Sequence, residues 1–91
     1  MTNVHSLNTS PADFNQLVSS RDWRTRAEVA RRTSQEKYLD ILVNDQSWQV
    51  RLAVAFSGKE KYLAQLEVDE NEVVRQEVAR QRRFNKEVEK W

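Results

Sequence analysis

Apolar side chains recur along the chain at the spacing of short amphipathic helices. Trp48, Leu52 and Ala55 stand at positions i, i+4 and i+7, and a segment that begins at Trp23 repeats this spacing. The periodicity predicts that one side of each segment packs against the rest of the protein. Seven helices are expected, with bounds near residues 11–19, 22–32, 35–43, 47–56, 58–67, 70–81 and 84–91.

Residues that favour helix starts stand at several of these boundaries. Ser10 precedes Pro11, which matches the preference for Ser at the N-cap and Pro at the first helical position. Ser57 and Glu60 have the spacing of a capping box, and Ser34 begins a partial one. Isolated helices under about 12–15 residues are marginal in water, so each helix must bury its apolar side on its neighbours.

The helices also repeat in sequence, with a period of 24–25 residues. The pattern Arg-x-x-Val-Ala begins at Arg26, Arg51 and Arg75, and the pattern Tyr-Leu-x-x-Leu begins at Tyr38 and Tyr62. Stacked helix pairs explain this recurrence, because each pair buries its apolar side on the next. A compact helical bundle is the alternative, but it gives no reason for the repeat.

The repeat predicts which side chains are buried. Trp23 and Trp48 stand at equivalent positions, and we expect both in the core. Val88 and Trp91 occupy the places that Leu39 and Leu42 hold in an earlier copy. Trp91 either seals the last helix pair or forms an exposed end. The aliphatic residues expected in the core are Leu39, Leu42, Leu52, Val54, Leu63, Leu66 and Val78.

The repeated pattern resembles the HEAT-like repeats, in particular the short bacterial form once called the leucine-rich repeat variant. The residues that carry the resemblance are an Asp, then Val-Arg-x-x-Val-Ala, then a second helix that ends Leu-x-x-Leu. One copy of this pattern extends from Asp45 to Leu66. A second copy extends from Asp69 to Trp91, where Val and Trp replace the two leucines of the second helix. The resemblance implies an all-α fold, a short right-handed α-solenoid of about three helix pairs with an N-terminal capping helix.

The resemblance also implies a domain organisation and a structural role for the repeated arginines. Residues 1–9 would form a flexible tail and residues 10–91 a single repeat domain. In this family the arginine pairs with the Asp between helices as a structural ladder. The pairs expected here are Arg51 with Asp45, Arg75 with Asp69, and Arg26 with Asp22. The first copy departs from the pattern, because Ser20 and Thr25 replace Asp and Val.

In HEAT-like solenoids the second helix of each pair lines the concave face, which makes its outward residues a candidate groove. Three lysines against four acids give these residues a net charge of −1, which disfavours a phosphate backbone and suits a protein or peptide partner. Phe56, expected on the side of its helix opposite Trp48, and Trp91 are candidate apolar anchors. A solvated face without a partner is the alternative. The groove residues are Glu36, Lys37, Asp40, Glu60, Lys61, Asn85, Lys86 and Glu89.

Arginines outside the groove support an alternative function, nucleic-acid binding through phosphate contacts. Residues 21–32 carry five arginines against two acids, and residues 75–91 carry six basic residues against three acids. Solvated helix ends are the other interpretation of these clusters, and association of the ends of the helical array is a further option. The candidate phosphate contacts are Arg21, Arg24, Arg31, Arg32, Arg80, Arg82 and Arg83.

Composition narrows the chemistry that the chain can perform. It has 91 residues, with 15 Lys+Arg, 14 Asp+Glu, one His, one Gly and no Cys. These counts leave no basis for thiolate chemistry, for a His-based metal or acid–base site, or for a Gly-rich phosphate loop. We therefore expect a protein without catalysis, cofactor or metal. The start of the chain lacks the features of a signal peptide, so we expect a cytoplasmic protein, an accessory protein of a bacterium or phage.

Overall fold

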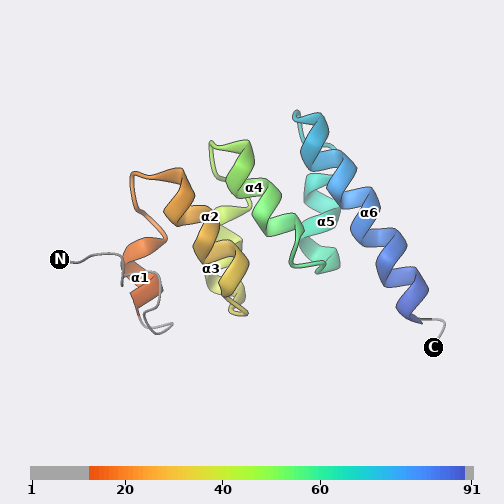
Figure 1. The fold of residues 1–91 in the computed structure, drawn as a ribbon, viewed down its shortest axis with the longest axis horizontal. Coiled ribbons are helices and arrows are strands. Elements are labelled where there is room, and N and C mark those ends of the chain that lie inside the picture. The colour runs from red at the N-terminus through yellow and green to blue at the C-terminus, as the bar shows by residue number, and fades with distance from the viewer. Residues whose placement is uncertain (1–12, 90–91) are drawn as a thin grey trace.

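The structure is a computed structural model that describes residues 13–89, and that part of the chain is all-helical, without strands. The helices follow one another along the longest axis of the molecule, and they lie side by side in chain order (Figure 1). The principal-axis extents are 46 × 31 × 19 Å. The helices are α1 (Phe14–Leu17), α2 (Trp23–Arg32), α3 (Glu36–Leu42), α4 (Trp48–Ala55), α5 (Glu60–Leu66) and α6 (Glu72–Glu89).

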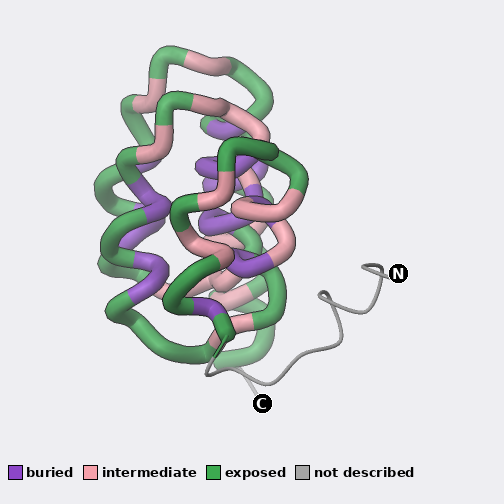
Figure 2. Tube along the Cα trace, turned by 90° about the vertical axis from the view of Figure 1, so that its left-hand side faces the viewer, coloured by how far each residue is buried: buried purple, intermediate pink, exposed green. Residues whose placement is uncertain are grey.

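Helices α2 to α6 form two sets, and α1 packs against α2. The first set, α2, α4 and α6, packs in succession, with α4 between the other two. The second set covers one side of the first, because α3 contacts α2 and α4 while α5 contacts α4 and α6. Seen from the end of the molecule, the buried stretches of the two sets face each other across the middle (Figure 2). This arrangement gives every short helix a neighbour on which to bury its apolar side.

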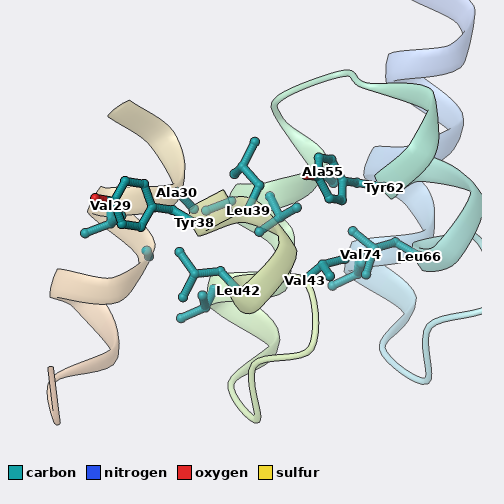
Figure 3. Packing of buried hydrophobic residues seen from close by; sticks show 14 of the residues in the cluster. Val29, Ala30, Tyr38, Leu39, Leu42, Val43, Ala55, Tyr62, Leu66 and Val74 are labelled. Carbon is teal, nitrogen blue, oxygen red and sulfur yellow. The ribbon is translucent and has the colours of Figure 1, made fainter. Parts of the chain in front are cut away.

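The core lies between the two sets of helices. Of the seven aliphatic residues expected there, six are buried, and only Leu52 remains partly exposed. The aromatic rings of Tyr38 and Tyr62 join them, and Figure 3 shows both rings among aliphatic side chains of neighbouring helices. The largest fully buried side chains are Tyr62, Leu39, Leu42, Leu63, Leu66, Val29, Val50, Val54 and Val74.

The last two helices expected from the sequence form one continuous helix, α6. The prediction of a break between residues 81 and 84 is wrong, because α6 continues to Glu89. At the equivalent place after α4, Gly58 adopts a φ of 71°, which side-chain-bearing residues rarely adopt, and the chain turns there. The segment from Gln81 to Phe84 has neither Gly nor Pro, so nothing interrupts the helix. Val88 is consequently exposed, although Leu39 at the equivalent place of an earlier copy is buried.

The predicted capping boxes are also absent. The hydroxyl of Ser57 accepts a hydrogen bond from the N–H of Lys59 at 3.3 Å, and α5 begins only at Glu60. Thr33 makes the same contact with the N–H of Gln35 before α3. In both places a short turn replaces the cap, which shifts the helix start towards the C-terminus. The expectations for residues 1–9, Ser10, Pro11 and Trp91 lie outside the described residues.

Candidate functional site

The three repeated arginines share one local arrangement. In each, Nη1 donates a hydrogen bond to the backbone carbonyl of the residue six positions earlier. Arg26 bonds to Ser20 at 2.6 Å and Arg51 to Asp45 at 2.7 Å. Arg75 bonds in the same way to the carbonyl of Asp69, at 2.6 Å. The turn before each helix therefore fixes the guanidinium of that helix.

Two of these arginines also bind a carboxylate, but from the following copy of the pattern. Arg51 donates from Nε and Nη2 to the two oxygens of Asp69, at 2.7 and 3.1 Å. Arg26 binds Asp45 in the same way, at 2.7 and 3.0 Å. All four side chains are at least 89% buried, since their exposed fractions are 11% and 9% in one pair and 11% and 7% in the other.

The expected pairing of each arginine with the acid of its own copy is therefore wrong. The carbonyl of Asp45 bonds to Arg51, whereas its carboxylate bonds to Arg26, so the two groups serve opposite neighbours. Likewise, the carbonyl of Asp69 bonds to Arg75, whereas its carboxylate bonds to Arg51. Arg75 therefore has no bond to the carboxylate of Asp69. The carboxylate of Asp22 caps α2 by accepting from the N–H of Arg24, whereas the guanidinium of Arg26 bonds to Ser20 and Asp45.

The buried pair Arg51–Asp69 has a defined electrostatic state. Burial alone raises the pKa of Asp69, but hydrogen bonds from Arg51 and from the N–H of Asn71, together with the charge of Arg51, lower it below its ordinary value. The hydrogen bonds to Asp69 raise the pKa of Arg51 in turn. Both groups are therefore charged at neutral pH, and the pair stabilises the fold only while Asp69 stays ionised.

This state predicts a loss of stability in acid. A carboxyl with a lowered pKa in the folded protein stabilises it above the ordinary pKa, near 4, and that stability is lost as the pH falls through the folded pKa. We expect melting temperatures by circular dichroism to stay level near neutral pH and to fall below about pH 4. The fall should be shallower in Asp69→Asn, which has no carboxyl to protonate there. Equal slopes in both proteins would contradict this assignment.

Residues of the expected groove on α3 and α5 pair with one another. Nζ of Lys61 lies 3.3 Å from Glu36 and 3.1 Å from Asp40. The hydroxyl of Tyr62 donates to Asp40 at 2.6 Å, and this bond, followed by that from Lys61, lowers the pKa of Asp40. Burial, followed by the bond to Asp40, raises the pKa of Tyr62 to about 12. Lys37 differs, because it lies 5.0 Å over the ring centroid of the adjacent tyrosine and has no ion pair with the described residues.

The remaining groove residues gather around a separate hollow of about 720 Å³ beside the last turns of α6. Arg82 bonds to Glu60 and to Glu67 across α5, while Asn85 donates to the carbonyl of Gly58 at 3.0 Å. The exposed apolar side chains of Phe84 and Val88, 63% and 51% exposed, line the same hollow. The structure thus divides the expected groove into two places. The groove residues that line the hollow are Glu60, Asn85, Lys86 and Glu89.

Most of the candidate phosphate contacts are engaged inside the molecule. Arg31 and Arg32 both bind Glu28, at 2.5 and 2.6 Å. Arg80 binds Glu77 at 3.2 Å, and Arg82 holds the two glutamates of α5 described above. Among residues 13–89, two members of the set, Arg21 and Arg83, are exposed and make no ion pair.

An aromatic surface on α2 and α4 was not expected from the sequence. A groove of about 220 Å³ between these helices is lined by Trp23, Trp48, Leu52 and Phe56, with Ala27, Arg31, Gln49 and Ala53 around them. We call the first four residues the α4 face. Trp23 is 38% and Phe56 44% exposed, and the other two are partly buried. The core position expected for Trp23 is therefore wrong, and Trp48 only borders the core.

Phe56 is exposed, as expected of an anchor, but its expected place on the side opposite Trp48 is wrong. Trp48, Leu52 and Phe56 are four residues apart, so successive side chains lie on the same side of the helix, and all three line one groove. The sequence did carry a signal for this surface. Between Trp48 and Phe56 the only polar residues are Gln49 and Arg51, so the helix is apolar on nearly all sides. A helix of this kind is usually covered on all sides.

The neighbouring helices are polar where α4 is apolar. In the repeat register, Ala53 and Phe56 of α4 correspond to Glu28 and Arg31 of α2, which form an ion pair. They correspond equally to the ion-paired Glu77 and Arg80 of α6. At these two positions α4 is therefore apolar, whereas the helix on either side carries an ion pair.

Comparison of the chain with protein-family models, curated proteins and solved structures gave no match. Within residues 13–89, no helix combines the length and apolar character that a membrane crossing requires. The same residues contain no group of three or more His, Asp and Glu side chains placed to hold a metal ion.

Proposed function

We propose that this protein is a non-catalytic protein-binding module, an adaptor or inhibitor built as a short right-handed HEAT-like α-solenoid. Its support is the succession of α2, α4 and α6 with α3 and α5 on one side, together with arginine contacts that recur every 24–25 residues. The observation that carries the function is the α4 face. It exposes aromatic rings at the centre of the molecule, where the flanking helices carry ion pairs.

The composition and support of the α4 face suit a protein partner. Tryptophan and arginine are enriched among residues that dominate binding energy, and here Trp23 lies under the guanidinium of Arg24, 5.6 Å from its ring centroid. The side chains of α4 start from a helix that has neighbours on both sides. Their positions are therefore set before binding, which reduces the entropy lost on association. The hollow beside α6 lacks this support, because its apolar residues lie on the last turns of the helix.

The test compares two exposed phenylalanines, one on each candidate surface. A partner recovered from the native host is purified and titrated against Phe56→Ala and Phe84→Ala by calorimetry. We expect Phe56→Ala to weaken binding about 30-fold or more, the effect of a residue that dominates an interface, and Phe84→Ala to change it less than threefold. Both substitutions remove an exposed ring, so both should leave the melting temperature nearly unchanged.

The opposite result would contradict the proposed site. A loss confined to Phe84→Ala would move the binding surface to the hollow beside α6. The nucleic-acid alternative predicts a different pattern, in which Arg21→Glu and Arg83→Glu abolish binding and affinity falls log-linearly with salt. A peptide or protein held by the α4 face should show only a weak salt dependence.

A further inference from the structure

The two buried arginine–aspartate pairs define a recurring carboxylate site. In each, a backbone carbonyl holds Nη1, and the Nε and Nη2 donors of the same guanidinium then face outwards as a fork. The fork receives both oxygens of one carboxylate, at 2.7 to 3.1 Å. A bidentate pair of this kind is specific for geometry as well as for charge. In both occupied sites the ligand of this arrangement is therefore an aspartate carboxylate.

Arg75 has the same arrangement without the ligand. Its Nη1 donates to the carbonyl of Asp69 at 2.6 Å, as in the two occupied sites. Its Nε and Nη2 have no acceptor among residues 13–89, and the side chain is exposed. The bond to the backbone carbonyl already restricts the guanidinium. Binding of a carboxylate therefore costs little additional side-chain entropy.

The two aspartates that occupy these sites share a backbone conformation as well as a carboxylate. Asp45 and Asp69 each lie in a turn that leads into a helix. One oxygen of each also accepts the N–H two residues on, that of Ser47 at 2.9 Å and that of Asn71 at 2.9 Å. The arginine therefore binds an aspartate that its own turn already orients.

Near Arg75, α6 has a small exposed residue where the two earlier copies have a small buried one. The small residues Ala30 and Ala55, four positions after the two occupied arginines, are 3% and 0% exposed in the packed part of the molecule. The equivalent Ala79 is exposed. A small side chain at this position leaves space for another helix close to α6.

The bordering positions of α6 are polar. Glu72 and Gln76 replace the Trp and Leu that α4 has there, and they bond to each other at 3.1 Å. A partner would meet a polar surface around the carboxylate site, not an apolar one.

We infer that Arg75 is a second binding site of this protein, which takes the carboxylate of an aspartate in a helix-leading turn of a partner protein. The site lies on α6 and does not depend on the function proposed for the α4 face. It assigns to Arg75 the ligand chemistry that the same chain uses at Arg26 and Arg51.

Arginine side-chain NMR tests this site directly. The first probe is aspartate capped as the N-acetyl methylamide, titrated into ¹⁵N-labelled protein at neutral pH while the Nε–Hε signals are followed. We expect the Arg75 signal to shift and saturate, and the signals of Arg26 and Arg51 to stay in place because their forks are occupied. The exposed Arg21 reports non-specific association and should shift linearly without saturation. The capped asparagine should shift none of them.

A second probe tests the preference for a turn. The capped peptide of residues 44–49 contains the Asp45 turn, and its matched control carries Asp45→Asn. We expect the peptide to bind at Arg75 at least tenfold more tightly than the capped aspartate, and the control peptide not to bind. Equal affinities for peptide and single residue would overturn the assignment of a turn.

The substitution Arg75→Lys supplies the matched protein control. It keeps the charge but removes the fork, so saturable binding of both probes should disappear while the signals of Arg26 and Arg51 confirm an intact fold. Binding that survives in Arg75→Lys, or an Arg75 signal that only follows Arg21, would overturn the site. Sedimentation at the NMR concentration identifies one further outcome, because a dimer lost in Arg75→Lys would make a second copy the occupant in place of a different partner.

Discussion

Replacing Asp69 with alanine is expected to lower the free energy of unfolding by about 3–5 kcal/mol, because it leaves the charge of Arg51 buried and unpaired. That loss is comparable with the whole stability of a small domain, about 5–15 kcal/mol. Urea denaturation followed by circular dichroism measures it. The variant should begin to unfold at much lower denaturant concentration than the natural sequence.

Two matched variants separate the buried pair from a general effect of charge. Glu70→Ala removes a neighbouring exposed acid and should change stability by no more than about 0.5 kcal/mol. Replacing both partners with apolar residues, Arg51→Met with Asp69→Leu, should recover much of the loss, because no unpaired charge remains. If Asp69→Ala and Glu70→Ala unfold together, the pair does not have the role that its geometry indicates.

Truncating Leu63 to alanine is expected to cost about 2–5 kcal/mol, because its side chain is fully buried between the two sets of helices. The cost combines the lost burial of the removed atoms with the cavity that they leave. Leu52→Ala should cost clearly less, since Leu52 is only partly buried on the α4 face. Thermal and urea unfolding of both variants give the two values.

An exposed aliphatic residue provides the control for this comparison. Ile41 is 57% exposed, and Ile41→Ala should fall within about 0.5 kcal/mol of the natural sequence. If Leu52→Ala destabilises as much as Leu63→Ala, the α4 face belongs to the core of the folded protein and does not serve as a binding surface.

The elements of the fold that depend on local pattern could be predicted from the sequence. The spacing of apolar residues placed the first five helices close to their observed bounds and six of seven aliphatic core residues correctly. The continuity of α6 was missed because the repeat suggested a break at residues 81–84, where the local sequence contains no residue that interrupts a helix. Local helix propensity prevailed over similarity to the earlier copies.

The contacts that depend on stacking could not be predicted in the same way. The sequence shows that each arginine has an acid nearby, but not which neighbour the carboxylate of that acid faces. Only the packed helices show that Arg51 binds the carboxylate of Asp69, and that its bond to Asp45 goes to the backbone carbonyl. The α4 face was missed for a related reason, since Phe56 was treated separately from Trp48 and Leu52 although all three line one groove.

The arginine contacts also determine how the molecule shares its stability. A pair formed inside one copy would stabilise that copy alone, and each helix pair would be free to unfold separately. Arg26–Asp45 and Arg51–Asp69 instead join adjacent copies, so losing one copy also breaks the buried ion pair of the next. In nearest-neighbour terms, these bonds add to the coupling between units rather than to the intrinsic stability of each unit. Strong coupling of this kind favours loss of the whole structure in one cooperative step, even though every helix here except α6 is too short to persist alone.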